Sequence, residues 1–563
     1  MRPWTAPLLF LLLGCSARPA PPDLSDARGT DGAVASAEPH ATAVGLAVLA
    51  RGGNAVDAAV AVALALAVTY PAAGNLGGGG FLLLHRAGAR DEVAIDFRET
   101  APAAATRDMY LGPDGKPVEE RSLVGALAAA VPGTVAGLHL ALTRHGTMRW
   151  EELLEPAIRL AEEGFEVGPR QARDFEKERK LLDRFPATRR AFQPGGRFPR
   201  AGERLAQPDL ASTLRALARE GPRAFYEGGI AARIVTEMER SGGLITREDL
   251  ASYRAVERPP LRGSYRGLEV VSMGPPSSGG VALLEMLNLW EAVAAAPAPE
   301  PDPHLLAEVM RRAFGDRARF LGDSDFVEVP VARLTDPRYA AELARGIDRA
   351  RAGKSGKGGF VHGPAESEQT THFSVVDGRG DAIACTYTLN DGYGCGLVVE
   401  GAGFLLNNEM DDFAAAPGEP NLYGLIQGDG NAIAPRKRPL SSMTPTIVKR
   451  AGDPVLVLGS PGGPTIINSV LQVLLRVVDG GEPLDRAVAA PRLHHQWFPD
   501  RIDVERGAFP PAFLAALLDR GHVLRARDPM GNVQAIAIDG PRLHAVADPR
   551  GWGRAGVVRP EQE

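Results

Sequence analysis

The pattern of apolar and polar positions changes along the chain from helical to strand-like. Two helices are expected between residues 35 and 68, and helical patterns dominate residues 135–350, with 150–163 and 205–220 as clear examples. After residue 370 the apolar positions alternate, which predicts strands. The chain therefore has a helix-rich first part and a strand-rich second part.

The first two helices carry their own end signals. Gly52 and Gly53 are expected to end the first helix, because glycine readily adopts the left-handed conformation found there. Asn54 is expected to cap the second helix, with Asp57 three residues later. The apolar run over residues 58–68 is too short to span a bilayer, so it predicts a buried core helix.

A hairpin is predicted over residues 372–388, where two alternating segments flank a Gly-Arg-Gly turn. If the turn centres on Arg379, Thr370 faces Thr388 and Ser374 faces Ala384. The apolar face then consists of Phe373, Val375, Ile383 and Tyr387. Two threonines thus meet at the open end of the hairpin, directly after a glycine-rich segment (351–363) that predicts a mobile loop.

Shorter elements are expected on either side of this hairpin. Four glycines (77–80) lead into a buried strand at 81–84. A strand at 454–458 is followed by a glycine turn at 459–463 and a helix at 465–478.

Composition excludes several classes of protein. The 563 residues are 44% hydrophobic and 23% charged, which is typical of globular proteins and excludes general disorder. The net charge of -6 offers no basic excess for nucleic acid. Three cysteines cannot form a disulfide scaffold. Cys385 and Cys395 could pair, but Cys385 lies on the apolar strand face, which favours a buried free thiol.

The N-terminus predicts an export signal. Leu8–Leu13 is a short apolar run after a basic residue, as in a signal peptide (1–14), and Leu12–Cys15 resembles a bacterial lipobox. Cys15 is then the lipidated first residue of a polar tether (15–34), and Ser16 favours the outer membrane, on its periplasmic side. An ordinary secretory signal cut after Ser16 is the alternative.

Three other motifs do not lead to a function. Gly353-Lys354-Ser355 is no phosphate-binding loop, because position 348 is aspartate where a glycine is needed. Ser460 lies in GSPGG, which lacks the spacing of a nucleophile elbow. His494 and His495 are adjacent, so in a regular element both cannot face one metal. We expect no metal and no cofactor.

The threonine pair suggests a specific chemistry. A threonine hydroxyl is a weak nucleophile, but an N-terminal threonine carries an α-amine with a pKa near ~7.7–8.0 that can act as its base. This requires a cut before Thr370. The alternative is that Thr370 has only a structural role at the start of a strand.

Several long motifs resemble the γ-glutamyltranspeptidase family. They include SEQTTHFSVVDGRGDAIACTYTLNDGYG, LLNNEMDDF, RPLSSMTPTIV, GSPGG, GGNAVDAAVAVALALAVTYPAAGNLGGGGF, IDFRETAP and PRLHHQWFPD. The resemblance extends from about residue 35 to near the C-terminus. It implies an α+β N-terminal nucleophile hydrolase fold, a four-layer αββα sandwich of two antiparallel sheets between helical layers.

The resemblance also implies a precursor that cuts itself between Gln369 and Thr370. The products are a large subunit (35–369) and a small catalytic subunit (370–563), which remain together as a heterodimer. Thr370 then attacks γ-glutamyl compounds such as glutathione and passes the acyl group to water, an amino acid or a dipeptide.

The matching motif positions imply a role for each residue. The implied catalytic residues are Thr370, Thr388, Gly462 and Gly463, the two glycines supplying backbone N–H groups to the oxyanion. The implied substrate-binding residues are Arg98, Ser441 and Ser442 for the α-carboxylate and Asp412, Glu409 and Asn390 for the α-ammonium. His372 is expected to order its strand, and residues 414–436, with Tyr423, resemble a lid.

Two alternatives remain at this stage. One is a cephalosporin-acylase-like or glutaryl-acylase-like amidase of the same superfamily. The other is an uncut lipoprotein that only binds amino acids.

Overall fold

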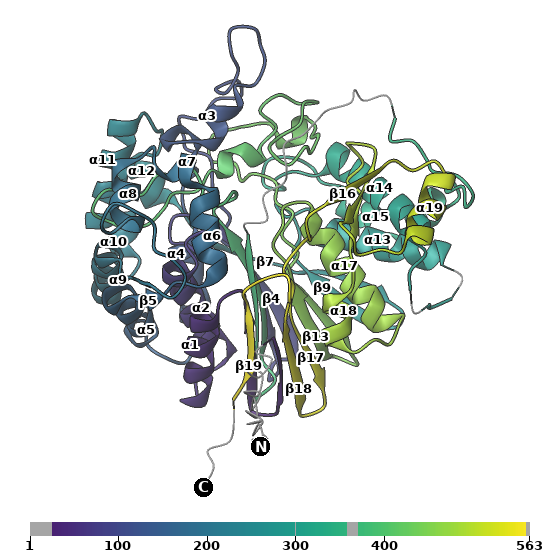
Figure 1. Cartoon of the computed structure of the whole chain (residues 1–563), viewed down its shortest axis with the longest axis horizontal. Helices are drawn as coiled ribbons and strands as arrows, with labels where there is room; N and C mark the ends of the chain where they lie inside the picture. Colours follow the sequence, from purple (N-terminus) through teal and green to yellow (C-terminus); the bar gives the residue numbers. More distant parts are fainter. Residues whose placement is uncertain (1–24, 295, 299, 357–369, 559–563) are drawn as a thin grey trace, which may run out of the picture.

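The computed structural model describes residues 25–294, 296–298, 300–356 and 370–558. Two seven-stranded sheets, here named sheet A and sheet B, lie at the centre of the molecule, with helices on both sides (Figure 1). Every neighbouring pair of strands within these sheets is antiparallel.

Sheet A runs in the order β1 (Asp26–Gly29), β18 (Arg542–Ala547), β17 (Gln534–Asp539), β13 (Asp453–Gly459), β12 (Thr446–Arg450), β9 (Leu268–Ser272) and β8 (Leu261–Tyr265). Sheet B runs in the order β19 (Arg554–Val557), β2 (Gly32–Ser36), β10 (Thr371–Asp377), β11 (Ala382–Thr388), β3 (Gly79–Arg86), β4 (Asp91–Asp96) and β7 (Val256–Arg258). Smaller sheets are formed by β14 (Leu493–His494), β15 (Ile502–Glu505) and β16 (Leu524–Arg527), and by β5 (Phe165–Glu166) and β6 (Arg204–Leu205).

Helices on the left of Figure 1 cover sheet B. They are α1 (Pro39–Ala50), α2 (Ala55–Thr69), α4 (Thr134–His145), α5 (Trp150–Glu163), α6 (Pro169–Lys177), α7 (Arg179–Leu182), α8 (Pro186–Phe192), α9 (Pro208–Glu220), α10 (Arg223–Tyr226), α11 (Gly229–Ser241) and α12 (Arg247–Ser252). Helices on the right cover sheet A. They are α13 (Gly279–Val293), α14 (Pro303–Phe320), α15 (Val331–Leu334), α16 (Pro337–Ala344), α17 (Thr465–Val478), α18 (Leu484–Ala489) and α19 (Pro511–Asp519). The remaining helical turns are α3 (Glu119–Leu123), η1 (Ala126–Ala128), η2 (Glu409–Asp412) and η3 (Asp429–Asn431).

Three apolar cores hold these layers together. Alternate residues of both sheets, such as Phe81, Val376 and Val457, pack into a core between the sheets. The opposite faces of the strands pack against the two helical layers. This is the four-layer αββα arrangement expected above, so the α+β fold class is confirmed.

The predicted N-terminal cap of α2 is confirmed. The Asn54 side chain accepts from the Asp57 N–H at 2.9 Å, and the Asp57 carboxylate accepts from the Asn54 N–H at 2.8 Å. Every residue of α2 is buried, as its apolar run predicted. Among the described residues, no helix combines the length and the apolar character needed to cross a bilayer.

The start of the chain differs from the prediction in two respects. The tether expected over 15–34 ends earlier, because β1 and β2 already belong to sheets A and B. For the same reason, residues 35 and 36 are strand rather than helix. The partner strands β10, β18 and β19 lie hundreds of residues later in the sequence, so no local pattern predicts this pairing. The signal peptide and Cys15 lie outside the described residues.

The hairpin register is confirmed. Thr371 pairs with Tyr387 and Ser374 pairs with Ala384 in the antiparallel β10–β11 pair. Both cysteines of this region, Cys385 and Cys395, are buried free thiols.

Candidate active site

The predicted nucleophile lies at the open end of the β10–β11 hairpin. Thr370 directly precedes β10 and is only 4% exposed. Thr388 is the last residue of β11 and pairs with Gly79 on its other side. Because Thr371 pairs with Tyr387, the antiparallel register places Thr370 opposite Thr388. The register therefore puts both threonines at the same end of the hairpin, while Gln369 lies outside the described residues.

Asn390 is fixed just beyond Thr388. Its φ is +81°, a left-handed conformation that is uncommon outside glycine. Its backbone N–H donates to Thr388 Oγ1 at 3.0 Å, and its Nδ2 donates to the Asn408 carbonyl at 3.1 Å. The Tyr423 hydroxyl donates to Asn390 Oδ1 at 2.8 Å. Strained residues that are held this firmly are concentrated at functional sites.

Gly462 and Gly463 form the turn into α17. Gly463 has a φ of +53°, and a Cβ there would lie 2.8 Å from the Tyr423 ring, so glycine is required. The Gly462 carbonyl accepts from the Thr465 N–H at 3.0 Å and from Thr465 Oγ1 at 2.7 Å. This turn precedes the N-terminus of a helix, whose dipole favours negative charge. Tyr423 thus joins the predicted oxyanion turn to Asn390.

A second group of predicted residues forms a buried charge cluster. Arg98 is fully buried and makes ion pairs with Glu409 and Asp412. Its Nε donates to the Pro439 carbonyl at 3.2 Å. The 3₁₀ turn η2 supplies both carboxylates from one short segment. Opposite charges therefore lie side by side, as recognition of a zwitterion requires.

Glu99, which follows Arg98 in the IDFRETAP motif, belongs to this cluster but was not among the predicted site residues. Its Oε2 lies 3.7 Å from an Arg98 nitrogen, and neither of its carboxylate oxygens has a hydrogen-bond partner among the described residues. Burial raises the pKa of Glu99 to about 8, although the Arg98 charge opposes this shift and the Asp412 charge adds to it.

The two predicted serines lie on the loop that leads into β12. Ser441 Oγ accepts from the Met443 N–H at 3.1 Å. Ser442 Oγ accepts from Arg317 Nη2 at 3.3 Å. Arg317 lies on α14 and was not predicted, because a single arginine in a helical pattern is normally expected on the surface.

The histidines of the motifs are buried and hydrogen-bonded, which does not suit them to proton transfer. His372 Nδ1 lies 2.8 Å from Thr386 Oγ1, and burial lowers the pKa of His372 to about 3. His494 Nδ1 accepts from Asn468 Nδ2 at 2.6 Å. Burial lowers the pKa of His495 to about 4, although its contact with Asp500 opposes this shift. These side chains order the elements around the site.

One buried cluster has ligands of the type that metals prefer. His304, Glu308 and His522 place one atom each within 4.8 Å of the others. The His304 and His522 rings, however, already hydrogen-bond to each other at 2.7 Å, and Glu308 forms ion pairs with Arg311 and Arg312. These interactions give the cluster a structural explanation.

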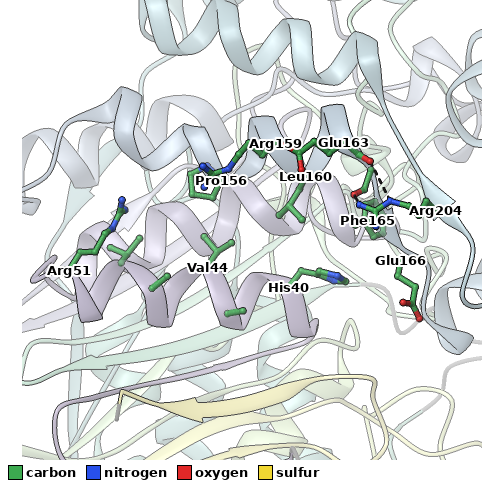
Figure 2. Close-up of a pocket in the computed structure, with 14 residues that line it drawn as sticks. His40, Val44, Arg51, Pro156, Arg159, Leu160, Glu163, Phe165, Glu166 and Arg204 are labelled. Carbon is green, nitrogen blue, oxygen red and sulfur yellow. Dashed lines mark hydrogen bonds between the residues drawn. The ribbon is translucent and has the colours of Figure 1, made fainter. Parts of the chain in front are cut away.

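A separate hollow of about 710 Å³ lies between α1 and α5 (Figure 2). Val44 and Leu160 project between these helices, and Arg204 donates to the Glu163 carbonyl at 3.4 Å. No predicted site residue lines this hollow. Its position indicates no role in the chemistry of the hairpin.

The chain is similar to known proteins over most of its length. The family model described as gamma-glutamyltranspeptidase matches residues 41–558. A glutathione hydrolase proenzyme of Escherichia coli K12 is 47% identical over 535 residues, covering 93% of this chain and 91% of that protein. A glutathione hydrolase proenzyme of Pseudomonas aeruginosa is 45% identical over 564 residues, covering 98% of this chain and all of that protein.

The fold is similar to that of a solved relative. The crystal structure of cephalosporin acylase from Bacillus halodurans superposes with a TM-score of 0.82 at 26% identity, covering 97% of this chain and 99% of that chain. The N-terminal nucleophile hydrolase sandwich expected above is thereby confirmed. Because the family model and both proenzymes match nearly the whole length, the chain belongs to the gamma-glutamyltranspeptidase family.

Proposed function

We propose that this chain is a self-processing gamma-glutamyltranspeptidase that cleaves the γ-glutamyl amide bond of glutathione and related compounds. The observation that carries the proposal is the buried pairing of Arg98 with Asp412 and Glu409. A γ-glutamyl group carries an α-carboxylate and an α-ammonium, and this cluster offers a partner of opposite sign to each.

Self-processing comes first. The Thr370 hydroxyl adds to the Gln369 carbonyl, the peptide C–N bond breaks, and the freed Thr370 nitrogen takes up a proton. Water then hydrolyses the resulting ester, which restores the hydroxyl and leaves Gln369 with a free carboxylate. The products are the large subunit (35–369) and the small subunit (370–563), held together as a heterodimer.

Turnover repeats this chemistry on a donor. The α-amine of Thr370 takes the hydroxyl proton while the oxygen attacks the γ-carbonyl. Thr388 supports the nucleophile, and the N–H groups of Gly462 and Gly463 stabilise the oxyanion. The amine leaves with a proton, and water or an amino acid or dipeptide then takes the γ-glutamyl group from the ester.

Donor recognition exchanges one set of ion pairs for another. Arg98, with Ser441 and Ser442, binds the α-carboxylate through a fork that suits its geometry. Asp412, with Glu409 and Asn390, binds the α-ammonium. Because the free site is already neutralised by internal ion pairs, both charged ends of the donor are needed to replace them without leaving a charge unpaired.

We expect binding of the glutamyl group to depend on pH. Glu99, with a pKa of about 8, keeps its proton near neutral pH. The α-ammonium of a ligand favours the ionised form, so binding lowers this pKa and releases the proton. The inhibition constant of L-glutamate should therefore fall as pH rises from 6 to 8, by up to about tenfold per unit for one proton.

Competitive inhibition by L-glutamate, measured across this range, checks this expectation. Glu99→Gln removes this proton and should reduce the dependence, leaving the part that comes from Glu409, whose pKa burial also raises. An inhibition constant that is constant or rises with pH in the unmodified enzyme would contradict the expectation.

The superposition with cephalosporin acylase favours one second candidate, an amidase for glutaryl side chains. Such a side chain lacks the α-amine and would leave Asp412 and Glu409 without a cationic partner from the ligand. Release of glutamate from glutathione, and faster cleavage of γ-glutamyl-p-nitroanilide than of glutaryl-p-nitroanilide, would support the transpeptidase. A preference for the glutaryl donor would favour the acylase.

A denaturing gel tests the remaining alternative, an uncut lipoprotein that only binds amino acids. Two bands are expected from the processed enzyme, whereas the binding protein would give one.

We also propose that residues 1–14 direct export and that Cys15 carries the lipid that holds the enzyme on the periplasmic side of a membrane, the outer membrane being favoured. Cys15→Ala should then move the activity from the membrane fraction to the soluble fraction. Equal distribution of both proteins after cell fractionation would contradict lipid anchoring at this residue.

A further inference from the structure

We infer that Arg317 is a positioning residue of the α-carboxylate site, where it orients the Ser442 hydroxyl and adds a second positive charge to that of Arg98. This inference rests on the proposed function, because it needs a donor with an α-carboxylate. It assigns a specificity role to a residue that no sequence motif singled out.

Arg317 contacts Ser442 directly and is linked to Ser441 through Ser278. Its side chain is buried, with the residue 2% exposed, and its Nε donates to Ser278 Oγ at 2.9 Å. Ser278 Oγ in turn donates to the Ser441 carbonyl at 2.6 Å. Arg317 Nη2 donates to Ser442 Oγ at 3.3 Å. One guanidinium thus supports the loop that carries both hydroxyls.

These hydrogen bonds decide how the hydroxyls are oriented. Arginine has no acceptor, so Ser442 Oγ can only accept from Arg317, and its own hydrogen remains available. The backbone N–H of Met443 plays the same part for Ser441. A carboxylate only accepts hydrogen bonds, so two hydroxyls whose oxygens already accept are prepared to donate to it.

The remaining nitrogen of Arg317 also supports a nearby α-carboxylate. Nη1 is buried and has no hydrogen-bond partner among the described residues. A buried donor without a partner is costly, and an anion held by Ser442 would lie within the field of this charge. Burial lowers the pKa of Arg317 to about 10, so the side chain remains charged at neutral pH, and the Asp412 charge opposes this shift.

The decisive comparison uses two competitive inhibitors that differ only in the α-carboxylate. L-Glutamate has this group, and 4-aminobutyrate lacks it but keeps the amine. In Arg317→Met, the inhibition constant of L-glutamate should rise about ten- to a hundredfold, as expected for losing hydrogen bonds to a charged group. The constant of 4-aminobutyrate should remain within about twofold. In assays with γ-glutamyl-p-nitroanilide, KM should rise more than kcat falls.

Arg319→Met is the matched control, because Arg319 lies on the same helix but is exposed. It should change neither constant. Arg317→Gln keeps a hydrogen-bond donor without the charge and replaces Arg317→Met if that chain remains uncut. Equal changes for both inhibitors, or none, would overturn the assignment. An unmodified enzyme that fails to cleave γ-glutamyl donors would instead overturn the proposed function.

Discussion

Thr370→Ala is expected to yield one uncut polypeptide and no measurable γ-glutamyl hydrolysis or transfer. Alanine lacks the oxygen that we propose attacks Gln369 during processing and the donor during turnover, so a single change should remove both reactions. We expect activity to fall at least about 10⁴-fold, as when a covalent nucleophile is deleted. The fold should be retained, because the register of β10 depends on residues 371–376.

A denaturing gel and an assay with γ-glutamyl-p-nitroanilide measure both effects. Thr370→Ser keeps the oxygen and should still give two bands. Mass spectrometry of the smaller band should find Thr370 as its first residue in the unmodified enzyme. Normal cleavage of the alanine variant, or a small subunit that begins at another residue, would contradict the mechanism.

Asp412→Asn is expected to lower kcat/KM for γ-glutamyl donors by about 10²- to 10³-fold, the loss typical of removing one partner of a buried charge pair. The change conserves shape and leaves Arg98 paired with Glu409. It removes the negative charge of Asp412. In the proposed complex this charge pairs with the α-ammonium of the donor, which displaces Arg98. Binding of the α-ammonium therefore loses its main partner.

Asp411→Asn provides the control at the neighbouring position. Asp411 is also buried, but its carboxylate accepts from Ser122 Oγ at 2.6 Å and from the Leu422 N–H at 3.1 Å rather than from Arg98. Cleavage of glutaryl-p-nitroanilide, which lacks the amine, should be slow and should not fall further in Asp412→Asn. A parallel loss on both donors would indicate general damage to the site.

Local patterns predicted the elements that local physics determines. The capping box of Asn54 and Asp57 depends on residues three apart, and the hairpin register depends on a two-residue period about Arg379. The apolar run of α2 likewise predicted its burial. Each of these features is complete within about twenty neighbouring residues.

The features that were missed depend on distant partners. β1 and β2 are short, and their strands are recognisable only once β18 and β10 lie beside them. Arg317 gains its role from Ser442, which reaches it from another part of the chain. Motif resemblance predicted Arg98 and Asp412, but only the folded chain shows that they form an ion pair with each other.

The order of strands has a consequence for how the enzyme must be made. In sheet B, β2 and β3 come from before Thr370 and enclose β10 and β11, which come from after it, while sheet A joins β1 and β9 to strands of the later part in the same way. With the proposed cut before Thr370, the two polypeptides are interleaved, so an unfolded molecule can refold only if two separate chains associate. Assembly as one continuous chain avoids this concentration-dependent search, so scission serves as a one-way step that should follow folding.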